Sequence, residues 1–228
     1  MDLSGKFIVV DGPDGSGKGT QLNRLEIWIT AVGGSCVRAK DPGGTAIGDR
    51  VRHLLLGHDL SEMDPRCEAL LFMASRAQLA TELIRPALAA GKTVLCDRYI
   101  SATCAYQVAA GYPCGEVIQL GRLAVGETWP HLTIVLDVPP ELGFERTGRK
   151  PNQSTRRNRA AAAGQMVIFD DATADAMERR PLEFHRRVRS LFLELPSVYP
   201  TPVVVVDAAR EVDAVFGDVQ EAIRRAFV

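Results

Sequence analysis

The sequence FIVVDGPDGSGKGTQL, residues 7–22, decides the fold that we expect for this chain. Residues 7–10 are an apolar run rich in β-branched side chains, which predicts a buried parallel strand. The run breaks at Asp11 into glycines, and a helix-forming segment follows them. In a strand, loop and helix of this kind, the backbone N–H groups and the positive end of the helix converge on one anion. The stretch therefore predicts an α/β protein that binds a nucleoside triphosphate.

The loop follows the phosphate-binding pattern G-x-x-x-x-G-K-[ST] with one departure. Gly12, Gly17 and Lys18 match, but Gly19 stands where the pattern has a hydroxyl, and Thr20 follows it. Lys18 would place its charge on the β and γ phosphate oxygens of ATP. Because the Ser or Thr after the lysine usually ligates Mg²⁺, that metal needs another ligand here. We expect nucleotide contacts along the whole loop, at Gly12, Asp14, Gly15, Ser16, Gly17, Lys18, Gly19 and Thr20.

The composition fits one folded domain over residues 1–228. With 228 residues, of which 46% are hydrophobic and 24% charged, the chain can bury a full core. A formal net charge of −1 provides no overall attraction for nucleic acid or for an anionic membrane. No apolar run reaches transmembrane length, and residues 1–7 lack a signal-peptide pattern. We therefore expect a soluble, cytoplasmic protein whose partners are neither nucleic acid nor membrane.

The cysteines carry no predicted chemistry. They are odd in number and share no metal-ligand spacing, and several lie among apolar or small residues. We expect reduced thiols that act as small core residues. The positions are Cys36, Cys67, Cys96, Cys104 and Cys114.

Strand-like and helix-like runs alternate along the chain. The predicted strands are residues 7–10, 35–39, 92–96, 132–138 and 203–207. The predicted helices are residues 20–32, 44–56, 66–90 with a bend at Pro86, two pieces split at 111–115, 139–147, 175–195 and a terminal helix. Five strands that are each followed by a crossover helix predict a five-stranded parallel sheet with helices on both faces, and ligands outside the carboxyl ends of the strands.

One irregular segment, residues 148–173, is polar, basic and rich in alanine. A run of charge is often a solvated face. After the fourth strand of a phosphate-binding protein, it is better interpreted as a lid, an insert at about 148–175, that closes over ATP and brings cations to the transferring phosphoryl group. Arg149 and Arg156 are the candidates for this role, and the sequence does not distinguish between them.

Together these segments resemble the thymidylate kinase (dTMP kinase) family of P-loop nucleoside monophosphate kinases. The resemblance covers residues 7 to about 208. The matching segments are GPDGSGKGT with Asp14 inside the loop, KDPGGT at 40–45, LLFMASRAQ at 70–78, DRYISATCAYQ at 97–107 and DAME at 175–178. The resemblance implies an enzyme that transfers the γ-phosphoryl group of ATP to dTMP, with Mg²⁺, giving ADP and dTDP.

The resemblance also implies a site for the acceptor phosphate. A monophosphate carries up to two negative charges, so it needs guanidinium groups that bind its oxygens in pairs. Arg98 stands where the family has its acceptor-phosphate arginine, although a structural ion pair is the alternative. Asp97 beside it becomes the anchor on the metal side, because residue 19 has no hydroxyl.

Base and sugar contacts follow from the same segments. Phe72 offers a ring for stacking, or packs in the core, and Arg76 lies four residues on, hence on the same face of the helix. Arg76 is expected to donate to a carbonyl of the pyrimidine. The remaining implied contacts are Thr103 and Gln107 at the base edge, Tyr106 near the sugar, Asp14 at the 3′-hydroxyl and Pro42 in the pocket wall.

The helices around residues 66–126 commonly form a homodimer in this family. Apolar side chains in that stretch could serve such an interface here, but they could equally belong to the core. They are Val117, Ile118, Leu120, Leu123 and Val125.

Departures from the family pattern leave other activities open. They are Lys40 for arginine, Ser75 for an acid, Ala102 for serine, Val108 for glycine and Ala176 for arginine. A kinase for another monophosphate, such as a dUMP analogue, dGMP or AMP, is one alternative. A nucleotide-dependent switch without transfer is another, but the presence of Arg76, Arg98 and Asp14 together argues against it, because a switch has no need for an acceptor-phosphate site. We expect direct in-line transfer, without a strong general base.

Overall fold

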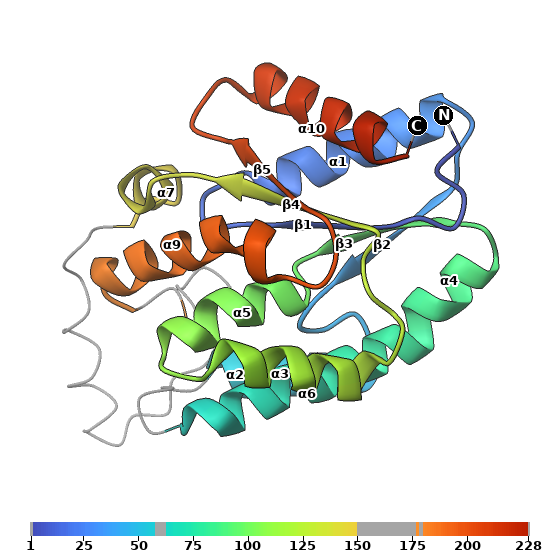
Figure 1. The fold of residues 1–228 in the computed structure, drawn as a ribbon. Helices are drawn as coiled ribbons and strands as arrows, with labels where there is room; N and C mark the ends of the chain where they lie inside the picture. Colours follow the sequence, from blue (N-terminus) through green and yellow to red (C-terminus); the bar gives the residue numbers. More distant parts are fainter. Residues whose placement is uncertain (1, 58–62, 150–176, 178–179, 228) are drawn as a thin grey trace.

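A five-stranded parallel sheet organises the molecule, as predicted (Figure 1). The computed structural model describes residues 2–57, 63–149, 177 and 180–227. The strands lie in the order β2-β3-β1-β4-β5, and every pairing is parallel. Their ends fall within one residue of the predicted ends. They are β1 (Phe7–Asp11), β2 (Cys36–Lys40), β3 (Thr93–Asp97), β4 (Leu132–Asp137) and β5 (Val203–Asp207).

The central strand is β1, and all five of its residues are buried. Val9 aligns with Cys96 of β3 on one side and with Thr133 of β4 on the other. Because β1 is central, the loop that follows Asp11 lies in the middle of the carboxyl edge of the sheet. This is where open parallel sheets bind their ligands.

One face of the sheet is covered by α1 (Lys18–Ala31) and α10 (Val212–Phe227), which lie above it in Figure 1. Their apolar faces meet the strands in a continuous core. The helical residues of this core include Leu22, Leu25 and Ile29 of α1 and Val215, Val219 and Ile223 of α10.

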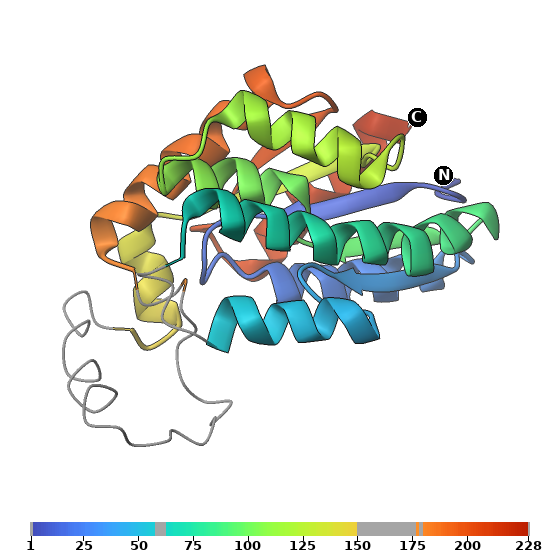
Figure 2. The same cartoon turned by 90° about the horizontal axis from the view of Figure 1, so that it is seen from below.

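The other face carries more helices, seen from below in Figure 2. They bury the second and larger core cluster against the sheet. The helices on this side are α2 (Ala46–Gly57), α3 (Pro65–Leu79), α4 (Arg85–Ala89), α5 (Ile100–Ala109), α6 (Cys114–Val125) and α9 (Leu182–Val198). The short α7 (Pro140–Arg146) follows β4 at the carboxyl edge.

The long helix predicted over residues 66–90 is interrupted by a π-helical turn. That turn, η2 (Ala80–Ile84), joins α3 to α4 without a loop. The N–H group of Arg85 donates to the carbonyl of Ala80, five residues back. Pro86 follows directly, and it has no N–H group and needs room for its ring over the preceding turn. The wider π turn provides that room, and it stands directly before the proline at which a bend was predicted.

One predicted helix start was wrong. Within the described part of the chain, α9 begins at Leu182 rather than at 175, with Pro181 as its extended N-cap residue. The break predicted at 111–115 is present, between the end of α5 at Ala109 and the start of α6 at Cys114, which directly follows Pro113. Proline favours the position at which a helix starts, because it lacks the N–H group that the first turn cannot use. Residues 175, 176, 178 and 179 lie outside the described residues.

The exposed fractions settle some of the apolar and cysteine predictions. Val117 and Val125 are fully buried, so they belong to the core, whereas Leu123 is 84% exposed. All cysteines are free thiols, of which Cys96 and Cys104 are buried. Cys67 is exposed, so its prediction as a core residue was wrong. Among the described helices, none combines the length and the apolar composition needed to cross a membrane.

Candidate functional site

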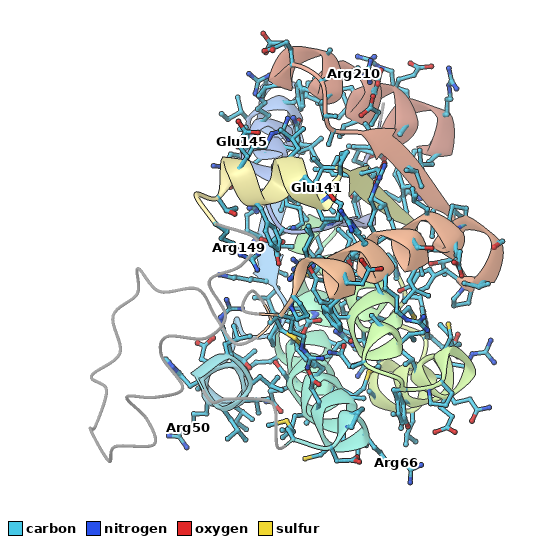
Figure 3. The ribbon with its side chains drawn as sticks, turned by 90° about the vertical axis from the view of Figure 1, so that its left-hand side faces the viewer. Arg50, Arg66, Glu141, Glu145, Arg149 and Arg210 are labelled. Carbon is cyan, nitrogen blue, oxygen red and sulfur yellow. The ribbon has the colours of Figure 1, made fainter. Side chains whose placement is uncertain are left out.

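A cavity of about 250 Å³ opens at the carboxyl edge of the sheet. Figure 3 views the molecule from this side. Lys18 and Asp97 line the cavity, as does every residue predicted to bind substrate. Those residues are Asp14, Pro42, Phe72, Arg76, Arg98, Thr103, Tyr106 and Gln107. The fold thus brings segments from β1, β2, β3, α3 and α5 to one space.

The glycine loop packs tightly against neighbouring backbone. Gly12, Gly15 and Gly17 all have positive φ angles, which favour glycine. A Cβ atom on Gly12 would lie 2.4 Å from the carbonyl oxygen of Leu136, and one on Gly15 would lie 2.3 Å from that of Gly143. Any side chain at either position would therefore displace the loop from β4 or α7.

The loop keeps hydrogen-bonding groups unused. The N–H groups of Gly15, Gly17, Lys18 and Gly19 donate to no acceptor among the described residues. The hydroxyl of Ser16 is buried and has no partner there either. Buried polar groups normally find a partner, so this set fits an anion seated at the start of α1.

Lys18 folds back over this loop. Its Nζ atom donates to the carbonyl oxygens of Gly12, at 3.0 Å, and Pro13, at 2.9 Å. Burial, together with the positive charge of Arg98, lowers the pKa of Lys18 to about 8, against the opposing effect of Asp14. Lys18 is thus a cation held by neutral partners.

Arg98 lies beside Lys18, since its Nη1 atom donates at 3.2 Å to the same Gly12 carbonyl oxygen that Lys18 contacts, and it is ion-paired to the loop. Its backbone φ angle is +67°, a left-handed conformation that residues other than glycine rarely adopt. Its Nη2 atom donates to Asp14 Oδ1, at 2.6 Å, and to the hydroxyl of Tyr106, at 3.2 Å. Its Nη1 atom lies 3.4 Å from Asp11 Oδ1. The two interpretations of Arg98 are therefore compatible, because it forms a structural ion pair and also lines the cavity.

Asp11 is a site residue that sequence reasoning passed over, except as the end of the strand. It is fully buried and accepts from the N–H group of Gly12, at 2.9 Å, and the hydroxyl of Ser101, at 2.7 Å. Burial raises its pKa, although the charge of Arg98 opposes this. Asp11 could have been predicted from its position as an acidic residue at the end of the central strand, because ligands bind at the carboxyl edge of a parallel sheet.

Asp14 pairs with two arginines. Besides Arg98, it has Arg149 at 3.8 Å. Burial raises the pKa of Asp14, but the positive charges of Arg98 and Lys18 outweigh burial and lower it overall. Asp14 is therefore ionised, and it links the glycine loop to the end of β3 and to the segment after α7.

Arg76 is fixed at the base of the cavity. Its side chain is 1% exposed and forms an ion pair with Asp41, whose Oδ2 atom lies 2.7 Å from Nε. Nη2 also donates to the carbonyl oxygen of Tyr99 at 3.0 Å, and the hydroxyl of Thr103 accepts from both Nη atoms at 3.3 Å. Asp41 was missed, although it stands beside the predicted Pro42 in the segment KDPGGT.

Phe72 and Arg52 complete the wall. Phe72 is 8% exposed and belongs to the core cluster, yet it also lines the cavity, so both of its interpretations hold. Arg52 was not predicted. It donates to the carbonyl oxygen of Pro42 at 2.9 Å and lines the cavity with Leu56. The four-residue spacing of Arg52 and Leu56 on one helix was the signal that could have found them.

The departures from the family pattern fall in different places. Lys40 and Ala102 line the cavity, so these two bear directly on the ligand. Ser75 is fully buried, and its hydroxyl accepts from the N–H group of Gly43 at 3.1 Å. Val108 packs against the core. Ala176 lies outside the described residues.

Arg149 is the first described part of the predicted lid. Figure 3 shows it near α7, at the carboxyl edge of the sheet. Its guanidinium lies 4.1 Å from the ring centroid of Phe144, and Nη2 lies 3.3 Å from Nε2 of His185. Burial lowers the pKa of His185 to about 4, so the neutral ring accepts this hydrogen bond. Arg156 lies outside the described residues, as does the rest of the predicted lid up to 176.

The residues suited to a divalent cation are few. Asp97 lines the cavity next to Arg98, and no described side chain donates a hydrogen bond to it. No group of three or more His, Cys, Asp or Glu side chains gathers around a common point in the described residues. Mg²⁺ in nucleotide sites commonly uses one or two carboxylates with phosphate oxygens and water, and a single aspartate fits that pattern.

Comparison with known proteins gives a consistent result. The family model described as thymidylate kinase matches residues 10–219. The chain is 40% identical to the thymidylate kinase of Deinococcus radiodurans over 96% of both chains. It is 40% identical to that of Syntrophotalea carbinolica, over 92% of this chain and 90% of the relative, and 41% identical to that of Protochlamydia amoebophila, over 90% and 86%.

Proposed function

The chain belongs to the thymidylate kinase family, and from this premise we propose how its residues transfer the γ-phosphoryl group of ATP to dTMP, giving ADP and dTDP. One observation carries the proposal. The loop that holds Lys18 and the arginines at 76 and 98 line the same cavity. A kinase needs a donor phosphate site and an acceptor phosphate site within reach of each other, whereas a nucleotide switch needs only the first.

The donor site is the glycine loop. The unused N–H groups of Gly15, Gly17, Lys18 and Gly19 and the hydroxyl of Ser16 bind the phosphate oxygens of ATP. Gly12 keeps the loop close to β4, and Thr20, in the first turn of α1, is a further proposed contact. Lys18 exchanges its carbonyl partners for the β and γ phosphate oxygens, and its protonated form is the one that binds.

The acceptor site is formed mainly by Arg98, with Tyr106 beside it. Arg98 donates to the phosphate of dTMP, and Asp14, which already orients Arg98, accepts from the 3′-hydroxyl of the sugar. Phe72 stacks on the base, and Arg76, Thr103 and Gln107 form its polar edge. Pro42 shapes the wall.

The transfer itself needs little proton chemistry. The acceptor phosphate is an anionic nucleophile near neutral pH, so positioning and charge stabilisation account for the rate. Lys18, Arg98 and Arg149 supply positive charge at the transferring group, and Arg156 is a further candidate from the lid. Asp97 would hold Mg²⁺, which would supply further positive charge for the phosphates of ATP.

A substrate screen tests this assignment. Purified protein with Mg-ATP is given dTMP, dUMP, dGMP or AMP in parallel, and release of ADP is followed. We expect dTMP to give the highest kcat/KM. A clear preference for another monophosphate would contradict the base assignment. No ADP with any of them would favour the nucleotide switch.

A homodimer is a further proposal. Leu70 of α3 is 49% exposed and Leu123 of α6 is 84% exposed, and these two helices pack against each other. Large exposed apolar side chains on neighbouring helices are typical of an interface. Sedimentation at micromolar concentration should show a dimer, and Leu123→Asp should shift it to a monomer.

We also propose a domain organisation, a location in the cell and the absence of one class of partner. One is a single kinase domain over residues 1–228 with a lid insert at about 148–175. Another is a cytoplasmic location, which the free cysteine thiols favour, because thiols stay reduced there. The last is that nucleic acid is not a partner, which a filter-binding measurement would check.

A further inference from the structure

Glu68 lies behind the cavity, between Gln107 and Arg180. It is in the first turn of α3, is 1% exposed and does not line the cavity itself. Its Oε1 atom accepts from Nε2 of Gln107 at 3.2 Å, and its Oε2 atom accepts from Nη2 of Arg180 at 3.2 Å. A buried carboxylate thus connects a cavity residue on α5 with an arginine just before α9.

The charge of Glu68 determines which way the amide of Gln107 faces. An ionised carboxylate only accepts hydrogen bonds, so Gln107 must present its NH₂ group to Glu68. Arg180 pairs with this carboxylate and so favours its ionised form, and the guanidinium of Arg180 is held 4.6 Å from the ring centroid of Phe184. Burial raises the pKa of Glu68, and the charge of Arg180 and the hydrogen bond from Gln107 limit that rise.

The other end of the amide is unused by the protein. Gln107 is 1% exposed and lines the cavity, and its Oε1 atom accepts no hydrogen bond from the described residues. Because the NH₂ group turns toward Glu68, which is not part of the cavity lining, the carbonyl end of the amide is the part of Gln107 left to face the cavity. With the NH₂ group committed to Glu68, the group that Gln107 offers to a ligand is a hydrogen-bond acceptor.

We propose that Glu68 is a positioning residue that fixes the Gln107 amide with its carbonyl oxygen toward the ligand, and so selects a base that carries a donor at N3. Thymine and uracil have an N–H group at that position, whereas cytosine has a bare nitrogen that accepts. An acceptor in the site pairs with the former and repels the latter. The inference rests on the proposed function, because it assumes that a pyrimidine monophosphate occupies the cavity.

The experiment compares kcat/KM for dTMP and dCMP in the wild type and in Glu68→Gln, Gln107→Ala and the double variant. Glu68→Gln removes the charge and frees the Gln107 amide to turn. We expect the ratio of dTMP to dCMP to fall about tenfold, the effect of one misdirected hydrogen bond. In the Gln107→Ala background, Glu68→Gln should change the ratio less than twofold, since Glu68 acts through Gln107.

A matched pair serves as the control. Gln78 donates to Glu82 at 2.7 Å, but this pair is exposed and away from the cavity. Glu82→Gln should leave the ratio unchanged. Thermal melts of all variants separate lost selectivity from lost folding, because a purely structural role for Glu68 would lower stability without altering the ratio.

If Glu68→Gln does not fold, Arg180→Gln takes its place. This variant removes the ion pair with Glu68 by changing its more exposed member. We expect a fall in the ratio of about threefold, again absent in the Gln107→Ala background. An unchanged ratio, or a change that persists without Gln107, in a protein that phosphorylates dTMP overturns this inference alone. A wild-type protein that phosphorylates no pyrimidine monophosphate overturns it together with the proposed function.

Discussion

The two sides of the cavity hold their cations in opposite ways. On the donor side, Lys18 donates to two carbonyl oxygens of its own loop, which are neutral. On the acceptor side, Arg98 and Arg76 are paired with the carboxylates of Asp14 and Asp41. The lysine of the proposed donor site is therefore held by neutral backbone groups, whereas the arginines of the proposed acceptor site are paired with carboxylates, although Arg98 also donates to the carbonyl oxygen of Gly12.

This difference has a physical consequence. A phosphate can replace neutral carbonyl partners of a lysine readily, because the exchange brings opposite charges together. An arginine that is already paired with a carboxylate keeps its orientation before the ligand arrives. The protein loses stability when one member of a buried ion pair is removed. Changes on the donor side should therefore cost activity, whereas changes on the acceptor side should also cost stability.

The largest expected effect is at Lys18. Lys18→Met removes a charge that stabilises the transferring phosphoryl group, and we expect kcat to fall by about a thousandfold or more, with the fold intact. Turnover is measured with saturating Mg-ATP and dTMP, and folding by circular dichroism. Lys92→Met, at an exposed lysine, is the control. Near-normal turnover would remove Lys18 from the mechanism.

The second test contrasts the two arginines. Arg98→Met should lower kcat/KM for dTMP about a hundredfold, because a phosphate contact is lost. Arg76→Met should lower the unfolding free energy by about 3 kcal/mol, because Asp41 is left buried without its partner. Arg98 is 19% exposed, and its partners Asp11 and Asp14 keep Ser101 and Arg149 beside them, so its loss should cost less stability, about 1 kcal/mol.

A double variant sharpens this contrast. Adding Asp41→Asn to Arg76→Met removes the stranded carboxylate and should restore part of the lost stability in urea denaturation. Equal stability losses at positions 76 and 98 would show that burial does not distinguish the two arginines.

A smaller effect is expected from outside the loop. Gly143 of α7 lies against the loop, and a Cβ atom there would be 2.3 Å from the carbonyl oxygen of Asp14. Gly143→Ala should displace the glycine loop at Asp14 and raise KM for ATP about tenfold. Alanine itself favours the helix over glycine by about 1 kcal/mol, so the helix should remain folded. Gly217→Ala, a helical glycine with open space around it, is the control and should leave KM unchanged.

The smallest effect concerns the pH dependence of stability. The pKa of Lys18 is lowered from 10.5 to about 8 on folding, so between these values the unfolded chain binds more protons at this site. The unfolding free energy of the wild type should therefore rise with pH from 8 to 10, relative to Lys18→Met, by on the order of 1 kcal/mol. Urea titrations of both proteins at pH 7, 8, 9 and 10 measure this difference. A difference that falls with pH would contradict the assignment.

The sequence by itself determined the sheet and the glycine loop, whereas the predicted cavity residues followed largely from the resemblance to the family, and Asp41 and Arg52 were missed. The sheet and the loop each depend on a local pattern, such as the apolar run of β1 or the glycines that precede Lys18. A parallel sheet then brings all the strand ends to one edge, so Asp97 and Arg98 had to lie near the loop.

Only the tertiary structure decided how the side chains pair. Arg76 with Asp41, and Gln107 with Glu68, join residues more than thirty positions apart. The pKa of Lys18 likewise depends on burial and on the charge of Arg98. Such contacts depend on the distance between elements and on the exclusion of water, and neither quantity is encoded in a local run of residues.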